Sequence, residues 1–310
     1  MKQGTVIKVA GNIFSVRTDA GDCTTCYVKG RLRIEGLRAT SPAAVGDRVD
    51  FERSESGPGL IARIHPRKNY IIRKAVKKSS EVQVIASNID QALLMVSLVS
   101  PKTLTGFIDR FLVTAEAYRI PVILVFNKTD LYGKKEQEEL AYFSRTYTGA
   151  GYKCMHTSVT ENKNIDSVKD TLKNKITLLS GNSGVGKSSM LNLIQPDLYL
   201  KTDEISSAHD TGKHVTTFAE MITMGNNARI IDTPGVKSFG IVDFYRNELF
   251  HYFPEMFSRS KECKFNDCTH IKEPKCAVKR AVESGEIASF RYENYLKIFR
   301  DEDMDVEYDD

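Results

Sequence analysis

The sequence predicts a multidomain protein: an N-terminal all-β barrel, a central α/β domain with a parallel sheet, and a C-terminal helical domain. Residues 1–67 alternate short apolar runs with turn signals at a spacing of about 8–12 residues. From about residue 89, buried strand-like runs alternate with helical stretches, which is typical of βαβ units. After residue 239 the chain is helical and basic, and contains a cysteine cluster. We therefore expect domains at 1–67, 68–239 and 240–310.

The N-terminal segment fits an OB-type barrel, a fold that binds oligonucleotides, and an SH3-like barrel would give almost the same pattern. Residues 1–78 carry 16 Lys/Arg against 7 Asp/Glu. This excess of positive charge suits a polyanionic partner such as RNA, although a solvated linker at 66–78 explains part of it equally well. The last ten residues hold seven acidic side chains, which we interpret as a solubilising tail.

Composition favours a cytoplasmic protein. The N-terminus lacks the apolar core of a secretory signal, and no apolar run reaches the roughly 18 residues that span a bilayer. Six cysteines in 310 residues, three of them between 263 and 276, do not form the pattern of an extracellular disulfide framework. We expect no membrane partner and a monomer.

The central domain is predicted from alternating elements. The expected strands are 90–99, 121–128, 152–158, 176–180 and, last in the series, 228–232. The expected helices are 104–119, 134–147, 165–173 and 187–194. Strands that alternate with helices form a parallel sheet covered on both faces.

The stretch GNSGVGKS, between a predicted strand and a predicted helix, matches the phosphate-binding loop G-x-x-x-x-G-K-[ST]. Its glycines let backbone N–H groups approach phosphates, and Lys187 reaches the β- and γ-phosphates. Ser188 offers a hard oxygen ligand to Mg²⁺. The residues expected to contact the nucleotide here are Gly181, Asn182, Ser183, Gly184, Val185, Gly186, Lys187, Ser188 and Ser189.

A second group of residues is expected beside the γ-phosphate and Mg²⁺. Asp232, at the end of the strand in IIDTPG, can hold Mg²⁺, and the Gly235 N–H can contact the γ-phosphate. In the switch segment DTGKHVTTFAEM, Thr216 or Thr217 can complete the Mg²⁺ shell; we prefer Thr216.

The stretch NKTD, at the end of the strand VILVF, selects guanine over adenine. Both N1–H and the N2 amino group of guanine can donate to the carboxylate of Asp130, whereas adenine would leave that carboxylate unpaired. Asn127 can bond the Hoogsteen edge and Lys128 can cover the base. Thr129 completes the motif, and Ser158, in TSV after the next strand, is expected to contact guanine O6 through its backbone.

The guanine motif precedes the phosphate loop, the reverse of the usual GTPase order. Because strands of a parallel sheet need only be neighbours in space, joining the old termini and cutting elsewhere preserves the site. The sequence therefore predicts a circularly permuted P-loop GTPase whose switch leads directly into the C-terminal domain.

The position that holds a water-orienting Gln in Ras-type GTPases is Val236, which cannot hydrogen-bond water. We therefore expect slow intrinsic turnover. His214, in GKHVTT, is the candidate for positioning the attacking water, and the predicted catalytic residues are His214 and Lys187.

Four residues within CKFNDCTHIKEPKC form a complete Cys₃His set for a tetrahedral ion: Cys263, Cys268, His270 and Cys276. Since no position is left open, we expect one structural Zn²⁺ rather than a catalytic one. Cys23 and Cys26, in CTTC, lack a second ligand pair, and we interpret them as ordinary barrel residues.

Taken together, the barrel, NKTD before GNSGVGKSS before DTPG, GKHVTT, and C-x₄-C-x-H-x₅-C resemble the RsgA family of ribosome small subunit-dependent GTPases over essentially the whole chain. The resemblance implies a bacterial assembly factor that binds the immature small ribosomal subunit and its rRNA. It also implies GTP hydrolysis stimulated by the subunit and coupled to release, with His214 as the hydrolytic residue. Val215 stands where the family more often has threonine, so Thr216 and Thr217 both remain candidates.

Two other functions are considered. One is a GTP-binding RNA adaptor with negligible turnover, which Val236 favours. The other is an ATP-using P-loop enzyme, which requires NKTD to be a chance match.

Overall fold

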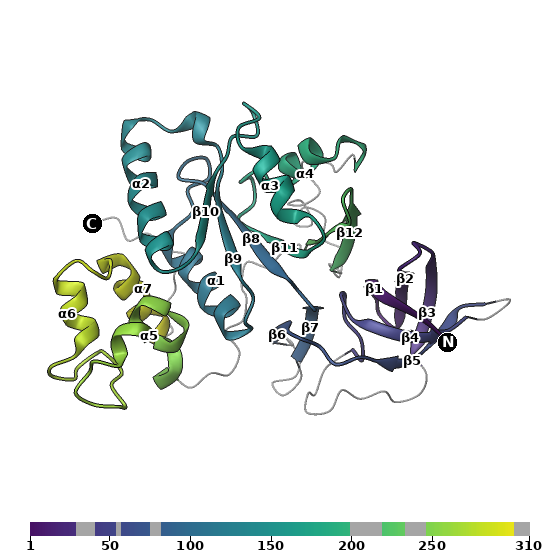
Figure 1. The fold of residues 1–310 in the computed structure, drawn as a ribbon, viewed down its shortest axis with the longest axis horizontal. Helices are drawn as coiled ribbons and strands as arrows, with labels where there is room; N and C mark the ends of the chain where they lie inside the picture. Colours follow the sequence, from purple (N-terminus) through teal and green to yellow (C-terminus); the bar gives the residue numbers. More distant parts are fainter. Residues whose placement is uncertain (29–40, 54–56, 75–81, 199–218, 233–245, 301–310) are drawn as a thin grey trace, which may run out of the picture.

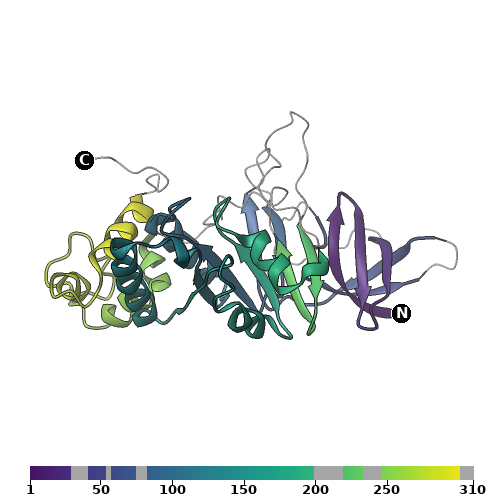
Figure 2. The ribbon, with the colours of Figure 1, turned by 90° about the horizontal axis from the view of Figure 1, so that it is seen from above.

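The computed structural model describes residues 1–28, 41–53, 57–74, 82–198, 219–232 and 246–300. A β-barrel, an α/β domain and a helical lobe lie in a row, with the α/β domain in the middle (Figures 1 and 2). Within the described ranges, no helix is both long enough and apolar enough to cross a membrane.

The barrel consists of five strands, β1 (Lys2–Ala10), β2 (Ile13–Thr18), β3 (Cys23–Val28), β4 (Arg48–Glu52) and β5 (Gly59–Ile64). Their order is β1-β2-β3-β5-β4, and β4 closes the barrel by pairing with β1. The β3–β5 pair is parallel and the other pairs are antiparallel. A parallel β3–β5 pair characterises an OB-type barrel rather than an SH3-like one, so the topology decides between the two alternatives.

Alternation along the strands fills the barrel. Phe14 and Val16 of β2 and Val49 and Phe51 of β4 point into one core cluster, while the residues between them are more exposed. On β3, Cys26 belongs to this core and Cys23 is exposed. The two thiols therefore lie on opposite faces of the strand, which supports their interpretation as ordinary barrel residues.

The central sheet has the order β10-β9-β8-β11-β13-β12. Its strands are β8 (Gln91–Val96), β9 (Val122–Phe126), β10 (Lys153–His156), β11 (Ile176–Ser180), β12 (Glu220–Met224) and β13 (Ala228–Asp232). Strands β8 to β11 and β13 pair in parallel, and β12 is antiparallel to β13. The chain therefore enters the sheet at β8, in its middle.

Four helices cover the sheet: α1 (Thr105–Ala117), α2 (Lys134–Gly149), α3 (Ile165–Leu172) and α4 (Lys187–Ile194). Short 3-10 turns are η1 (Thr129–Leu131) and η2 (Pro196–Leu198). Leu94 and Val96 of β8 pack in the same cluster as residues of α1 and α2, whereas Leu93 and Met95 pack with residues of α3 and α4. Both faces are buried, as the continuous apolar runs predicted.

Three strands were not predicted. β6 (Tyr70–Lys74), which lies within the segment considered as a linker, forms a hairpin with β7 (Val82–Ser87), and β12 follows the predicted switch. The linker interpretation is wrong for residues 70–74. The basic residues around the buried apolar pair Ile71 and Ile72 gave this segment the composition of a linker. β12 is short and only partly buried, so it lacks the continuous apolar run of the parallel strands.

The C-terminal lobe comprises η3 (Arg246–Tyr252), α5 (Pro254–Ser260), α6 (Ala277–Glu283) and α7 (Ser289–Arg300). Its core includes Val113 of α1, so the central domain completes it. On α7, Phe290 stacks edge-on against Phe143 and Tyr147 of α2, with ring centroids 5.4 and 5.9 Å apart. The lobe is therefore packed directly on two helices of the central domain.

Candidate nucleotide site and metal centre

Two loops of the central sheet that are distant in sequence lie at the same edge. Residues 127–130 follow β9, residues 181–186 follow β11, and β8 separates the two strands. All three strands are parallel, so their carboxyl ends face the same way, which is where open α/β sheets bind ligands. The reversed order of the motifs therefore has no consequence for their position in space.

Asn127 connects the two loops directly. Its side-chain amide donates to the Val185 carbonyl in the phosphate loop, with N and O 2.8 Å apart, and its own amide oxygen accepts from the Thr157 hydroxyl at 3.0 Å. A side chain on Gly186, whose φ is +101°, would place its Cβ 2.5 Å from the Asn127 amide nitrogen. Glycine is required there both for the backbone conformation and for this contact.

The Asp130 carboxylate is held in place by Ser158, whose hydroxyl donates to it at an O–O distance of 2.6 Å. The Ser158 hydroxyl in turn accepts from the Glu161 N–H at 3.0 Å. The sequence predicted only a backbone contact for Ser158. A serine directly after a strand at the sheet edge is the signal that could have revealed its side-chain role. Lys128 extends to the Ser100 carbonyl.

The phosphate loop leads into α4, which begins at Lys187. The Lys187 ammonium donates to the carbonyls of Gly181 and Asn182, both at 2.8 Å, and so lies across the loop. Ser188 is buried at the start of the helix. A helix N-terminus, backbone N–H groups and one ammonium ion together favour a polyphosphate.

Among the residues expected beside the γ-phosphate and Mg²⁺, Asp232 lies in the described part of the chain. Asp232 is the last residue of β13 and pairs in register with Leu179 of β11, the strand that leads into the phosphate loop. The remaining candidates lie outside the described residues: His214, Thr216, Thr217, Gly235 and Val236.

In the C-terminal lobe, the donor atoms of Cys263, Cys268, His270 and Cys276 all lie within 4.8 Å of one another. His270 Nδ1 is 3.4 Å from Cys276 Sγ and 3.6 Å from Cys263 Sγ, and these two sulfurs are 3.9 Å apart. Tetrahedral zinc, with bonds of about 2.0–2.3 Å, places neighbouring ligand atoms about 3.5–3.8 Å apart. The cluster therefore fits one zinc ion with no open position.

The surroundings also suit a metal. Burial lowers the pKa of His270 to about 4, which keeps the imidazole neutral, the form that binds metal. Burial raises the pKa of the Cys268 thiol to about 12, so without a positive charge nearby this sulfur would stay protonated. Backbone N–H groups of Ala277 and Lys279 donate to the sulfurs of Cys263 and Cys276, respectively. Such N–H donors stabilise thiolate ligands.

Glu273 organises the loop between the ligands. Its carboxylate accepts from the N–H and hydroxyl of Thr269 and from the N–H groups of Ile271 and Lys272, at 2.6–3.0 Å. Although burial acts in the opposite direction, these donors hold the pKa of Glu273 at about 2. Glu273 was not among the predicted residues, because its role depends on a local turn rather than on a motif.

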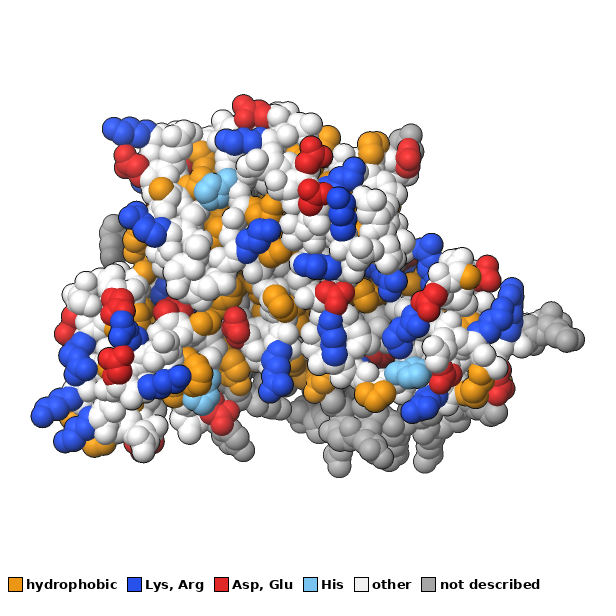
Figure 3. Space-filling view, viewed as in Figure 1, with side chains coloured by type: hydrophobic (Ala, Val, Ile, Leu, Met, Phe, Trp, Pro, Cys, Tyr) orange, Lys and Arg blue, Asp and Glu red, His pale blue; other side chains and the backbone are white. Residues whose placement is uncertain are grey.

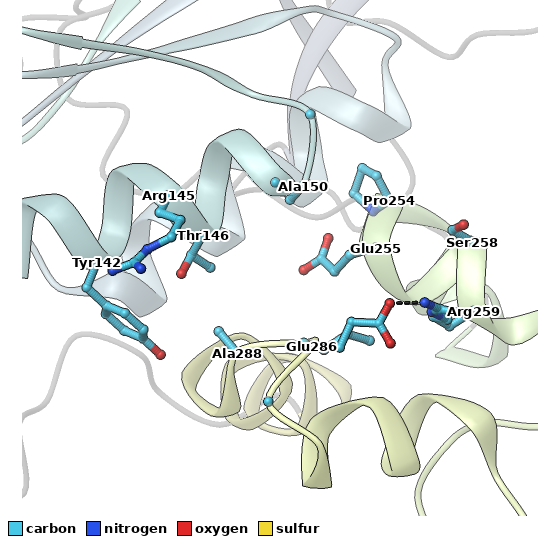
Figure 4. A pocket seen from close by; sticks show the side chains of 14 residues that line it. Tyr142, Arg145, Thr146, Ala150, Pro254, Glu255, Ser258, Arg259, Glu286 and Ala288 are labelled. Carbon is cyan, nitrogen blue, oxygen red and sulfur yellow. Dashed lines mark hydrogen bonds and ion pairs between the residues drawn. The ribbon is translucent and has the colours of Figure 1, made fainter.

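A cavity of about 890 Å³ lies away from both sites, between α2 and the C-terminal lobe (Figure 4). Most of the charged side chains that line it form ion pairs, Arg259 with Glu286 and Glu255 with Arg291. We interpret it as a polar seam between the two parts rather than as a reaction site.

Comparison with known proteins identifies the family. The sequence model of the RsgA GTPase matches residues 64–242, and that of the RsgA N-terminal domain matches residues 3–61. The chain belongs to the RsgA family. The small ribosomal subunit biogenesis GTPase RsgA of Christiangramia forsetii is 50% identical, over 99% of this chain and 98% of that protein. Its counterpart from Porphyromonas gingivalis is 48% identical, over 97% and 98%.

Solved structures agree. The crystal structure of YjeQ from Thermotoga maritima matches with a TM-score of 0.80 and 36% identity, covering 97% of this chain and 98% of that one. YloQ, described as a circularly permuted GTPase, matches with a TM-score of 0.75 and 30% identity, covering 97% and 94%. The predicted circular permutation is confirmed. The chain is a GTP hydrolase of this family, and the interpretation as an ATP-using enzyme is wrong.

Proposed function

We propose that this GTPase acts in small ribosomal subunit biogenesis, binds the immature subunit and its rRNA, and hydrolyses GTP when the subunit stimulates it. The observation that carries the proposal is the hydrogen bond from Asn127 to Val185, because it joins the guanine-reading loop to the phosphate loop. One GTP molecule can then contact both. Relatives that cover nearly the whole chain are named small ribosomal subunit biogenesis GTPases, which supports the first part of the proposal.

In this proposal Asp130, oriented by Ser158, accepts from guanine N1–H and the N2 amino group. Lys187 and the N–H groups of the phosphate loop bind the β- and γ-phosphates. Ser188 binds Mg²⁺, with Asp232 and Thr216 as its further protein partners. His214 positions the attacking water, a role that Val236 cannot fill.

Turnover of GTP, measured with and without purified small subunits, tests the proposal. We expect strong stimulation in the natural protein, loss of stimulated turnover in His214→Ala, and GTP affinity in that variant within about twofold of the natural value. Lys187→Ala serves as the inactive reference, because it loses a phosphate contact as well. A rate that small subunits leave unchanged would favour the adaptor function instead.

Two exposed surfaces suit the proposed rRNA partner. Lys and Arg side chains gather over the C-terminal lobe, at the lower left of Figure 3. There, Lys261 lies over the ring of the exposed Phe257, and Lys264 over that of the exposed Phe265. On the barrel, Tyr27 is exposed. Aromatic rings flanked by cations can stack unpaired bases while neutralising phosphates.

The Cys₃His cluster is proposed to hold one structural zinc ion, which would fix the loop 263–276 against α6 and α7. Metal analysis of protein purified without chelator should find about one zinc per chain, and Cys276→Ser should lower that content sharply. A content far below one in the natural protein would contradict the zinc assignment without affecting the GTP site. Because the proposed partner is the ribosome, we further propose a monomer that works in the cytoplasm.

A further inference from the structure

Strand β1 changes partner halfway along its length. At its C-terminal end Lys8 pairs with Glu220 of β12, while residues Lys2 to Thr5 pair with β4 instead. The pairing of β1 with β2 is irregular between Val6 and Lys8, which marks a bulge. Bulges bend a strand, and here the bend takes β1 away from β12 and into the barrel. A wedge therefore opens between the barrel and the GTPase domain, where β1 and β12 lie side by side in Figures 1 and 2.

This wedge is a pocket of about 220 Å³. A water molecule occupies about 30 Å³ in the liquid, so the pocket has room for a small polar group with some of its hydration. Ile7 and Met221 contribute apolar surface. The polar lining comes from both domains: Thr5, Arg17, Thr18 and Asp19 from the barrel, and Thr223, Asn227 and Arg229 from the GTPase domain.

The pocket carries excess positive charge. Arg17 of β2 has no hydrogen bond or ion pair with any described residue. Within the described part of the chain, Arg229 of β13 makes one side-chain hydrogen bond, a long one of 3.3 Å to Asn227, and it also attracts Asp19, whose pKa Arg48 and, less strongly, Arg229 lower. The nearby carboxylate of Asp19 is already neutralised by Arg48, which donates to both its oxygens at 2.7 and 2.9 Å. Two guanidinium groups from two domains therefore remain to be balanced.

Two hydroxyl groups in the pocket are free to donate a hydrogen bond. Thr5 Oγ1 accepts from Arg48 at 3.2 Å, and Thr18 Oγ1 accepts from the Asp22 N–H at 3.1 Å. A hydroxyl that already accepts retains its hydrogen to donate. Two such hydroxyls beside two guanidinium groups offer donors and positive charge but little acceptor capacity, which is the complement of an anion with several oxygens.

We propose that this interdomain pocket binds a phosphate group, with Arg17 and Arg229 as its principal ligands, and that the group belongs to the backbone of RNA. The RNA source rests on the proposed function, and it agrees with the OB-type barrel, whose strands 2 and 3 form the usual nucleic-acid face. Free inorganic phosphate presents the same chemistry. Since the ligands come from both domains, a bound phosphate would also fix the barrel relative to β12 and β13.

The first experiment measures binding of a short fluorescent uridine oligomer to the full-length protein, with GDP present, over a series of KCl concentrations. Neutralising one backbone phosphate contributes about 0.7–1 to the slope of log affinity against log salt. R17Q/R229Q should reduce the slope by about this amount. R17K/R229K should retain it, and R63Q/R145Q, which removes two exposed arginines elsewhere, should stay within about 0.3 of the natural protein.

The second experiment measures binding of inorganic phosphate by calorimetry, again with GDP saturating the nucleotide site. A loss of oligomer slope in R17Q/R229Q alone supports an RNA phosphate. Loss of phosphate binding in that variant without loss of oligomer slope supports free phosphate as the ligand. If R17Q/R229Q matches R63Q/R145Q in both measurements, the pocket is not an anion site.

The outcomes for the pocket can be distinguished from those for the proposed ribosomal function. Turnover that small subunits fail to stimulate would remove that function, while a slope or phosphate effect confined to R17Q/R229Q would still support the pocket. Conversely, normal stimulation together with unaffected binding in R17Q/R229Q would remove the pocket alone.

Discussion

The C-terminal lobe is attached to the GTPase domain through a buried guanidinium, whereas the N-terminal barrel is attached through a buried carboxylate and one strand pair. Arg291 of α7 donates to Asp109 of α1 at 2.7 Å and to Glu255 of α5 at 2.7 and 3.1 Å. It lies between the rings of Tyr147 and Phe253, 5.5 and 4.6 Å from their centroids. Its side chain is 1% exposed, so solvent does not weaken these interactions.

At the other end, Asp47 is fully buried and accepts from Arg67 at 2.5 and 2.6 Å, from the Ser87 hydroxyl at 2.6 Å and from the Ala44 N–H at 2.8 Å. These partners join the barrel to the end of β7, just before β8. Between barrel and β12, the structure has one register pair and the Lys8–Glu220 ion pair, whose side chains are 47% and 53% exposed.

The difference between the two junctions indicates which one can move at low energetic cost. The ion pair of Arg291 crosses 182 residues of sequence and fixes the lobe to the core of the GTPase domain. The barrel is fixed to β7 but only lightly to β12, the strand that enters the sheet beside β13. Small movements of β12 and β13 relative to the barrel should therefore have a lower energetic cost than any movement of the C-terminal lobe relative to the GTPase domain.

The largest effect is expected from Arg291→Met. It leaves Asp109 and Glu255 charged without their partner in a buried site, which should lower the free energy of unfolding by about 3–5 kcal/mol. Denaturant unfolding measures this. As a control, combining Arg291→Met with Asp109→Asn and Glu255→Gln removes the unpaired charges and should recover most of the loss. If Arg291→Met alone is as stable as the natural protein, the buried guanidinium does not hold the lobe.

Asp47→Asn tests the corresponding junction of the barrel. The amide keeps the shape but leaves the Arg67 guanidinium, whose side chain is 6% exposed, without a counter-charge. We expect a loss of about 2–3 kcal/mol, smaller than for Arg291 because one cation rather than two carboxylates loses its partner. The same unfolding measurement applies; a loss greater than that of Arg291→Met would reverse the order of the two junctions.

Gly46→Ala should cost about 1–2 kcal/mol. Gly46 has a φ of +95°, and a Cβ there would lie 2.1 Å from the Ser87 carbonyl oxygen, so the barrel would have to move away from β7. Gly11→Ala is a matched control, because Gly11 also has a positive φ of +61° but nothing within 4 Å of its Cβ position. If the two variants lose equal stability, the close approach at Ser87 contributes nothing.

The smallest effect is expected at the Lys8–Glu220 pair. Because both side chains are about half exposed, Lys8→Ala should lower the free energy of unfolding by only about 0.2–1 kcal/mol, and less at high salt. A double-mutant cycle with Glu220→Ala isolates the pair. A coupling energy of several kcal/mol would mean that the barrel is held to β12 as firmly as the lobe is held to α1.

Much of the fold was predictable because it depends on local patterns. Helix 187–194 and strand 228–232 have the predicted bounds, and α1 and α2 differ from prediction by one or two residues at their ends. The parallel strands β8, β9 and β11 carry apolar runs that no basic residue interrupts. β6 and β12 were missed because polar residues interrupt their apolar runs: β6 ends in Arg73 and Lys74, and β12 contains Glu220 and Thr223.

For the candidate sites, the motifs predicted which residues lie together but not what orients them. The loops 127–130 and 181–188 meet at one edge, and the four metal ligands cluster, as their spacing indicated. Ser158, Glu273 and Arg291 act through specific contacts that no motif encodes. Arg291 is, in addition, a charged residue at a position where a buried side chain would be expected to be apolar. Contacts of this kind depend on tertiary structure.

Through the pairing of Lys8 with Glu220, the barrel and the GTPase sheet form one eleven-stranded sheet. Without the barrel, β12 would be the edge strand of the GTPase sheet. A chain shortened by its first 67 residues would therefore present β12 to solvent along its whole length, with unsatisfied backbone groups and partly apolar side chains. Exposed edge strands pair with strands of other molecules, so the shortened protein should self-associate. Besides any part in binding RNA, the barrel thus protects its neighbour from aggregation.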